Sequence, residues 1–268
     1  MRYDVTYSGQ QLVPRARGYI FVVSHMRSFS SLLCHILGSH REIAGYAEMH
    51  QSYDGRSDLH QLARKVQDAT ETPIDGRYVL DKMLHAEQYI APAVLGRPDV
   101  RVLFLVRNAD DTLKSVLNLT HSYGAAYVNP DDARHYYVTR LLELERYSAL
   151  LGRNALYVDA ESLLEDTQAV LDGVADWLEL SEPLSATYRT FRFTGTKGYG
   201  DPSEHIATGK VIASAEDRHR SYVHVPIPET MLQQAREAYR ACREALTSRH
   251  QVVPFRSDRG PAPAAGSG

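Results

Sequence analysis

The chain has 268 residues, of which 43% are hydrophobic, so it is long enough to bury the core of a full-sized α/β domain. Its formal net charge of −3 argues against a general nucleic-acid binder, which needs a strong basic excess. No run approaches the roughly 20 apolar residues that span a bilayer, and residues 1–18 lack the apolar core of a signal peptide, which predicts a soluble, cytoplasmic protein without a membrane partner.

The first predicted elements are a strand at residues 19–23, a polar turn at 24–31 and a helix that begins near Leu32. A turn of small hydroxyl residues before a helix collects free N–H groups at the positive end of the helix dipole, which suits phosphate or sulfate. Arg27 adds a positive charge. The hydroxyl side chains beside it are Ser28, Ser30 and Ser31. An ordinary serine-capped turn explains the same pattern equally well.

Polar side chains follow the next two predicted strands, at residues 43–47 and 78–80. Functional side chains of open α/β sheets gather at the carboxyl ends of strands. After these two strands the polar residues are Glu48, His50, Asp81, Lys82 and His85. The apolar spacing at residues 59–69 predicts a scaffold helix, and another helix is expected at 86–95.

The strongest strand signal is the apolar run VRVLFLV at residues 100–106, which is typical of a strand buried on both faces. A helix starting near Asn108 would bring together Arg107, Asp111 and Ser115. Further expected elements are a helix at 131–151, a strand at 155–158 and a helix at 167–180. This alternation predicts an α/β fold, a mainly parallel sheet flanked by helices.

Residues 191–222 lack apolar periodicity and are rich in glycine and charge. Long irregular segments of compact domains are usually working loops or disorder. Gly195, Gly198 and Gly200, interleaved with Lys197, would let the backbone approach a phosphate closely. More positive charge comes from Lys210, Arg218 and Arg220. A last helix is expected at residues 229–246.

We therefore expect one domain at residues 19–250, preceded by a lead-in at 1–18 and followed by a flexible tail at 251–268. The last helix carries enough Leu, Met and Ala to pack against a second copy, so a homodimer is one expected assembly. Cys34 and Cys242 are too few for a disulfide framework and lack metal-type spacing, so both are expected to be reduced.

Three stretches together resemble the sulfotransferases that use 3′-phosphoadenosine 5′-phosphosulfate (PAPS). They are the Arg-Ser-x-Ser-Ser loop at residues 27–31, LFLVRNADDTLKS at 103–115, and LYVDAESLL at 156–164 with ADWLEL in the helix that follows. The resemblance covers most of residues 19–220. It implies the P-loop-like, nucleoside-kinase-like architecture of that family, with adenosine 3′,5′-bisphosphate (PAP) as the product.

By this resemblance, the phosphosulfate end of PAPS would be held by Arg27, Ser28, Ser30 and Ser31, and the 3′-phosphate by Arg107 and Ser115. Phe29 stands where the family has glycine, so the loop must accommodate a Cβ there, and the ring would cover the cofactor or face the acceptor. Ala109 replaces the family's proline. TKGYGDPSE resembles the loop that closes over the 3′-phosphate, which implicates Lys197 and Gly198, with Arg218 a weaker candidate.

Sulfuryl transfer needs positioning, cationic stabilisation of the leaving phosphate and a base, and it needs no metal. Lys82 is expected to bridge the sulfuryl group and the leaving oxygen. The residues that compete for the role of base are Glu48, His50 and His85, of which Glu48 is preferred because it lies at a strand end just after the anion loop and its helix. The alternative interpretation is that two of these three are polar rim residues.

Other classes of protein remain open on the sequence alone. A P-loop kinase would need GxxxxGK[ST], which is absent, since no glycine lies between Gly18 and Gly38. A module that binds adenosine bisphosphate without catalysis is a third interpretation. The acceptor is expected to be a small molecule with a hydroxyl or amine, such as a phenol, an alcohol or a sugar. The pocket would have aromatic walls from His121, Tyr123, Tyr127, Tyr136 and Tyr137.

Overall fold

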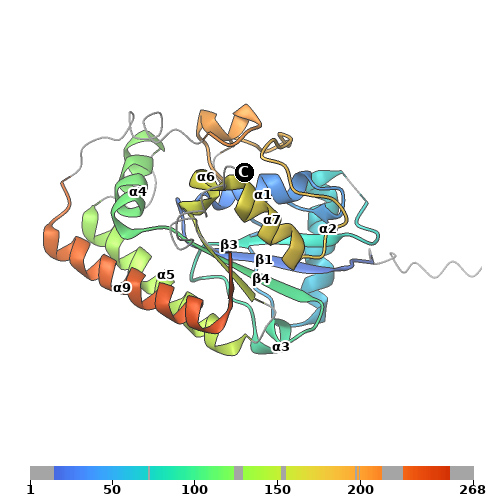
Figure 1. Ribbon diagram of the computed structural model, residues 1–268, viewed down its shortest axis with the longest axis horizontal. Helices are drawn as coiled ribbons and strands as arrows, with labels where there is room; N and C mark the ends of the chain where they lie inside the picture. Colours follow the sequence, from blue (N-terminus) through green and yellow to red (C-terminus); the bar gives the residue numbers. More distant parts are fainter. Residues whose placement is uncertain are drawn as a thin grey trace, which may run out of the picture.

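The computed structural model describes residues 15–71, 73–123, 129–151, 155–196, 198, 200–212 and 226–253, without the side chains of residues 120–123. Its centre is a sheet of six strands in the order β2-β3-β1-β4-β5-β6, and all neighbouring strands are parallel (Figure 1). The strands are β1 (Gly18–Ser24), β2 (Ile43–Ala44), β3 (Tyr78–Met83), β4 (Val100–Val106), β5 (Ala155–Asp159) and β6 (Gln251–Val252). The predicted α/β class with a mainly parallel sheet is confirmed.

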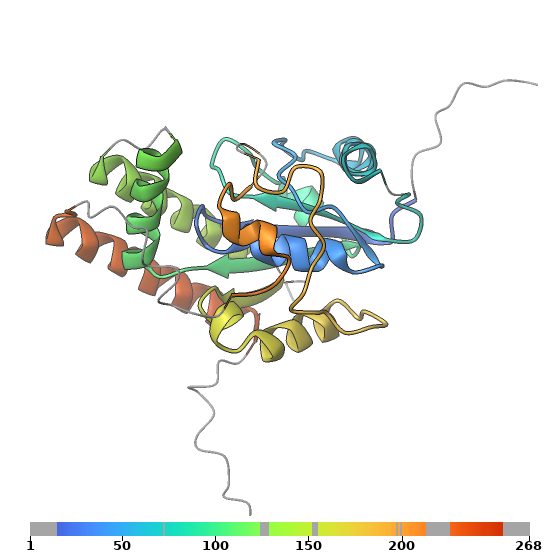
Figure 2. The same cartoon turned by 90° about the horizontal axis from the view of Figure 1, so that it is seen from above.

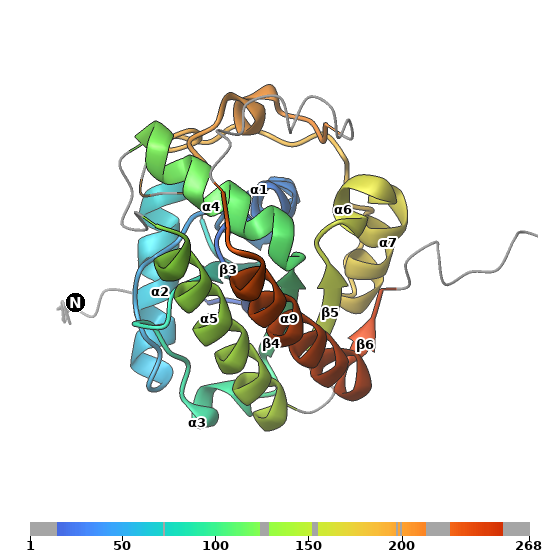
Figure 3. The same ribbon diagram turned by 90° about the vertical axis from the view of Figure 1, so that its left-hand side faces the viewer.

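Helices cover both faces of the sheet, as Figures 2 and 3 show. One face packs against α2 (Arg56–Thr70), α3 (Pro92–Leu95), α4 (Ala109–Tyr123), α5 (Pro130–Leu150) and α9 (Glu229–Arg249). The other face packs against α1 (Ser30–Ser39), α6 (Ser162–Glu165) and α7 (Thr167–Trp177). A short 3₁₀ helix, η1 (Glu204–Thr208), lies in the segment that crosses the sheet end beside α1 (Figure 2).

β1 and β4 are almost entirely apolar because both of their faces are buried. In β1, Phe21 and Val23 pack on the α5 side, whereas Ile20 and Val22 pack on the α1 side. β4 alternates in the same way, so its run of apolar residues fills two separate core layers. Such continuous runs are typical of strands covered by helices on both sides.

Several predicted boundaries were wrong. β3 extends to Met83, so Asp81 and Lys82 lie within the strand and not beyond it. The helix expected at 86–95 shrinks to α3, which begins at Pro92, a residue that favours the first turn of a helix. β2 has only two residues. Residues 251–252, which the sequence assigns to the tail, pair with β5 as β6, while residues 254–268 lie outside the described part of the chain.

Candidate active site

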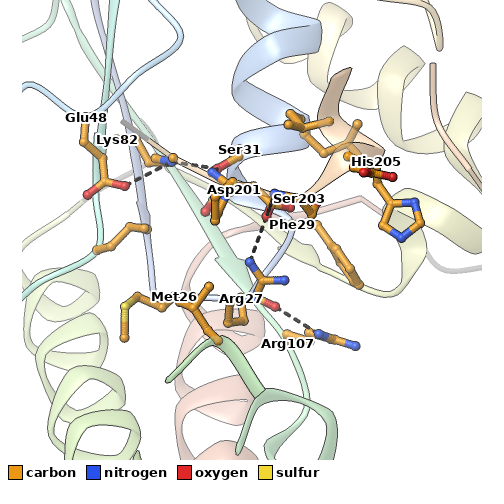
Figure 4. A pocket seen from close by; sticks show the side chains of 18 of the residues that line it. Met26, Arg27, Phe29, Ser31, Glu48, Lys82, Arg107, Asp201, Ser203 and His205 are labelled. Carbon is orange, nitrogen blue, oxygen red and sulfur yellow. Dashed lines mark hydrogen bonds and ion pairs between the residues drawn. The ribbon is translucent and has the colours of Figure 1, made fainter. Parts of the chain in front are cut away.

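A cavity of about 670 Å³ opens at the carboxyl ends of β1, β3 and β4 (Figure 4). Most of the site residues predicted from the sequence contribute to its wall. They are Arg27, Phe29, Ser30, Ser31, Glu48, His50, Lys82, His85, Arg107 and Gly198. The cavity therefore brings together three strand ends that lie far apart in the sequence.

The loop between β1 and α1 has an unusual backbone. Arg27 and Phe29 both have φ of 64°, in the left-handed region that a side chain disfavours. The Phe29 conformation is therefore the one that glycine would adopt without strain. The loop leads directly into α1, whose first N–H groups have no partner inside the helix.

His25 fixes this loop to the end of β4. The backbone N–H of Arg107 donates to His25 Nε2 over 3.0 Å, so the ring proton is on Nδ1, which donates to the Met26 carbonyl over 2.8 Å. Burial lowers the pKa of His25 to about 3, so the imidazole stays neutral at pH 7. The sequence analysis missed this residue, because nothing in its neighbourhood distinguishes it from the other histidines.

Ser28 supports the loop from inside. Its hydroxyl is fully buried, donates to the His25 carbonyl over 2.8 Å and lies 2.6 Å from Ser24 Oγ. The Ser28 side chain does not contribute to the cavity wall. Of the three predicted hydroxyl donors, Ser30 and Ser31 are the ones that line the cavity.

Lys82 and Glu48 form a buried ion pair at the base of the cavity. Lys82 Nζ lies 3.1 Å from Glu48 Oε1 and donates to Ser31 Oγ over 2.9 Å, and the two charged side chains are 1% and 7% exposed (Figure 4). The other carboxylate oxygen of Glu48, Oε2, lies 3.8 Å from His85 Nε2 and 3.9 Å from His50 Nδ1. Burial lowers the pKa of His85, so its imidazole is neutral at pH 7.

Asp81 holds the segment that carries Glu48. Its buried carboxylate accepts hydrogen bonds from the Met49 backbone N–H, over 2.9 Å, and from the Tyr53 hydroxyl. Burial raises the pKa of Asp81 to about 6, although these hydrogen bonds act in the opposite direction. Because Asp81 and Lys82 are neighbours in β3, their side chains reach opposite faces of the sheet.

Arg107 is buried at the opposite side of the cavity from Glu48, at 4% exposure. Its Nη1 donates to the Arg27 carbonyl over 3.1 Å, Nη2 lies 3.5 Å from Asp111, and the guanidinium carbon is 4.4 Å from the centre of the Phe29 ring. Nε has no hydrogen-bond partner among the described residues, since Glu161 Oε1 is 4.0 Å away. Phe29 thus covers the guanidinium.

Arg27 connects this side of the cavity with Ser115 and Asp201. Its Nε donates to Ser115 Oγ over 2.9 Å, and its Nη1 lies 3.0 Å from Asp201 Oδ1. Ser115 is buried and contacts Arg27, but it is not part of the cavity wall. Asp201 lines the cavity and was not selected from the sequence.

Gly198 and residues 200–212 close one side of the cavity. His50 Nε2 donates to the Gly198 carbonyl over 2.9 Å, and the Asp201 backbone N–H donates to Ser31 Oγ over 3.0 Å. Lys210 also lines the cavity. The predicted Lys197, Arg218 and Arg220 lie outside the described residues, as do Tyr127 and the side chains of His121 and Tyr123.

Three side chains of α5 support the site from behind. Tyr136 donates to the Leu84 carbonyl, Tyr137 donates to the Arg107 carbonyl, and neither is in the cavity wall, in contrast to the aromatic wall expected from the sequence. The buried Arg140 donates to the carbonyls of Ser24, over 2.8 Å, and Met83, over 2.7 Å. Arg140 therefore joins the ends of β1 and β3. The sequence analysis did not select it, although an arginine within the apolar face of a helix was a signal that could have identified it.

The described residues contain no group of three or more His, Cys, Asp and Glu side chains placed to hold a metal ion. Across the same residues, no helix combines the length and the apolar character that crossing a membrane requires.

Fold and cavity together define a parallel α/β protein whose cavity lies at the carboxyl edge of its sheet, beside the N-terminus of α1. Among solved structures, the chain is similar to the sulfotransferase domain from the curacin biosynthetic pathway, at 19% identity and a TM-score of 0.57, covering 83% of this chain and 98% of that domain. It is also similar to the sulfotransferase domain of the Synechococcus PCC 7002 olefin synthase, at 18% identity and a TM-score of 0.54, covering 85% and 97%. The chain thus has the sulfotransferase fold. No family model matches the sequence, and no curated protein matches it either.

Proposed function

We propose that this protein is a sulfotransferase that moves a sulfuryl group from PAPS to a hydroxyl or amine of a small-molecule acceptor. The observation that carries the proposal is that Arg27 and Arg107 line one cavity with the Lys82–Glu48 pair. Two cations at separate strand ends suit a ligand with two anionic ends, and a buried lysine beside a carboxylate suits transfer between them. The sulfotransferase fold supports the same assignment.

The residues present fit such a donor. Arg107 has a buried Nε without a hydrogen-bond partner among the described residues, as expected of a group that awaits an anion. The N-terminus of α1 adds N–H donors beside Ser30 and Ser31. We assign the phosphosulfate end to Arg27 and these two serines.

We assign the 3′-phosphate to Arg107. Ser115, which the resemblance of the sequence also places at the 3′-phosphate, accepts a hydrogen bond from Arg27 Nε and would instead orient Arg27 at the phosphosulfate end. Gly198 and, by the resemblance of the sequence, Lys197 and Arg218 would close over the donor.

When bound, the donor supplies the sulfuryl group, and the 5′-phosphate of PAP is a stable leaving group. Lys82 would stabilise the charge that develops on the leaving oxygen, because its ammonium is buried next to Ser31. Glu48 would accept the proton of the acceptor through Oε2, since Oε1 is engaged by Lys82. General-base help of this kind contributes roughly 10²- to 10⁴-fold.

His85 is the second candidate for the base, because it is neutral at pH 7 and lies beside Glu48. His50 holds the Gly198 carbonyl through Nε2 and contacts Gln88 through Nδ1, so both of its nitrogens are engaged. Glu48→Gln is expected to lower turnover about 10²-fold or more while PAP affinity changes little. A fully active Glu48→Gln variant would transfer the role of base to His85.

The donor assignment can be tested by calorimetry with PAP, ATP and ADP. The proposal expects PAP to bind most tightly, and equal or tighter binding of ATP would contradict it. Arg107→Ala should weaken PAP far more than adenosine 5′-monophosphate, whereas Arg240→Ala, an exposed arginine of α9 outside the cavity, should change neither. Equal losses for both nucleotides in Arg107→Ala would refute the 3′-phosphate assignment.

Tight PAP binding without transfer from labelled PAPS to any of a broad set of phenols, alcohols, sugars and amines would favour a non-catalytic binding module. Transfer to one of these acceptors would decide for the enzyme and identify the acceptor class.

A further inference from the structure

Asp201 places a carboxylate of the protein itself in the anion-binding part of the cavity (Figure 4). Its Oδ1 lies 3.0 Å from Arg27 Nη1 and accepts the Ser203 backbone N–H over 3.1 Å. Its own backbone N–H donates to Ser31 Oγ over 3.0 Å. Arg27, in the loop between β1 and α1, and Ser31, in the first turn of α1, both belong to the proposed donor site.

The residue before Asp201 lies against the other donor-site groups. A Cβ built on Gly200 would be 3.0 Å from Ser31 Oγ and 3.5 Å from Lys82 Nζ, and Gly200 has φ of 146°. A side chain at position 200 would therefore meet strain and crowding together. The backbone of residues 200–201 thus passes directly over the hydroxyl and ammonium that we assign to the transferred group.

Electrostatics keep Asp201 ionised. Burial raises its pKa, but the Arg27 guanidinium and the hydrogen bonds from Ser203 outweigh burial, so the pKa lies below the usual value. An ionised carboxylate and an anionic ligand repel each other, and they cannot both occupy the same face of Arg27.

We propose that Asp201 is an internal competitor of the donor: its carboxylate occupies Arg27 in the unliganded protein and has to leave before an anionic group of the donor can bind there. This inference rests on the anion site of the proposed function and requires neither the adenosine nor the acceptor. Asp201 then sets donor affinity and couples donor entry to displacement of residues 200–203.

The alternative role for Asp201, to orient Arg27 for binding, predicts the opposite change in ligand affinity. If Asp201 oriented Arg27 toward a bound ligand, removal of its charge would weaken binding. If it competes, removal of the charge takes away the competing anion at Arg27 and strengthens binding. The sign of the change in affinity therefore separates the two roles.

The test is calorimetry of the full chain with two probes, inorganic pyrophosphate and PAP, in wild type and Asp201→Asn. Asparagine can still accept the Ser203 N–H, so the local fold is retained. We expect both probes to bind about five- to tenfold more tightly in Asp201→Asn, and the gain to shrink at high salt. The matched control is Glu204→Gln, which removes an exposed negative charge from the same cavity wall and should change neither affinity by more than about twofold.

The gain must also depend on Arg27. In an Arg27→Gln background, Asp201→Asn should give no tightening, and thermal unfolding of each variant without ligand reports whether the fold is intact. Unchanged or weaker pyrophosphate binding in a folded Asp201→Asn variant would overturn the inference, as would an equal gain in Glu204→Gln. If Asp201→Asn tightens pyrophosphate while no variant binds PAP, the PAPS assignment fails and the competitor role stands.

Discussion

The Lys82–Glu48 pair allows a quantitative test of the site, because both charges are buried and lie 3.1 Å apart. At an effective dielectric constant of about 20, two unit charges at this distance attract by roughly 5 kcal/mol. Removal of one partner leaves the other charge buried without compensation, which typically costs about 3–5 kcal/mol. We therefore expect Lys82→Met and Glu48→Gln each to lose several kcal/mol of unfolding free energy.

The double variant should lose clearly less than the sum of the two single variants. Methionine and glutamine keep the approximate shape of the two side chains without their charges, so a coupling energy of about 2 kcal/mol or more is expected. Equilibrium unfolding in urea at pH 7 measures the coupling, provided that the denaturant slope is the same in all four proteins.

The chain offers a matched control for this cycle. Arg41 and Glu182 also lie 3.1 Å apart, but they are 62% and 53% exposed. The same replacements at that pair, Arg41→Met and Glu182→Gln, should show a coupling below about 1 kcal/mol because water screens the charges. Additivity within about 0.5 kcal/mol at Lys82 and Glu48 would refute the buried pair.

Two further predictions test the loop and the strand that hold this pair. Phe29→Gly should be more stable than Phe29→Ala by about 1 kcal/mol in urea unfolding, because residue 29 has φ of 64°, which glycine adopts without strain. Both variants lose the ring over Arg107, so the comparison isolates the backbone. Equal stability would contradict the left-handed backbone. Asp81 has its pKa raised from 3.8 to about 6, so the proton that it binds in the folded state stabilises the protein below pH 4, and this stability is lost as pH rises through 6. Relative to Asp81→Asn, wild type should lose about 2 kcal/mol between pH 4 and pH 7, and a constant difference would contradict the assignment.

The fold was largely predictable because its strands are buried on both faces. VRVLFLV in β4 and the apolar run in β1 are continuous for that physical reason, and the intervening helices carry a regular apolar stripe. β6 has two residues, and two residues carry no periodic signal. The helix expected at 86–95 was wrong in its start, because the helix begins only at Pro92, a residue that favours the first turn.

The cavity residues were predictable to the extent that they lie at strand ends. Glu48 and Arg107 follow strands, Lys82 is the last residue but one of β3, and a parallel sheet brings such positions to one edge. Their chemical roles stay predictions.

The residues that sequence reasoning missed are held by contacts across the chain. Asp201 contacts Arg27, which lies 174 residues earlier, and Arg140 donates to the Ser24 carbonyl, 116 residues earlier. No local pattern encodes either contact. The sequence places Ser28 in the anion site because its hydroxyl stands beside those of Ser30 and Ser31. In the structure, Arg27 and Phe29 on either side of it are left-handed, and the Ser28 side chain is buried against His25.

The strand order places the loop that leaves β1 between the two sides of the cavity. β1 lies between β3 and β4, with Val22 opposite Lys82 on one side and Ser24 opposite Leu105 on the other. The loop that leaves β1 therefore starts between the strand that carries Lys82 and the strand that ends next to Arg107. Ser31 reaches the lysine, and the Arg27 carbonyl reaches the Arg107 guanidinium. Because the loop contacts Arg107 and the first turn of α1 contacts Lys82, a change in the backbone at Phe29, where the loop joins α1, should alter the distance between the two sides of the cavity, and not one side alone.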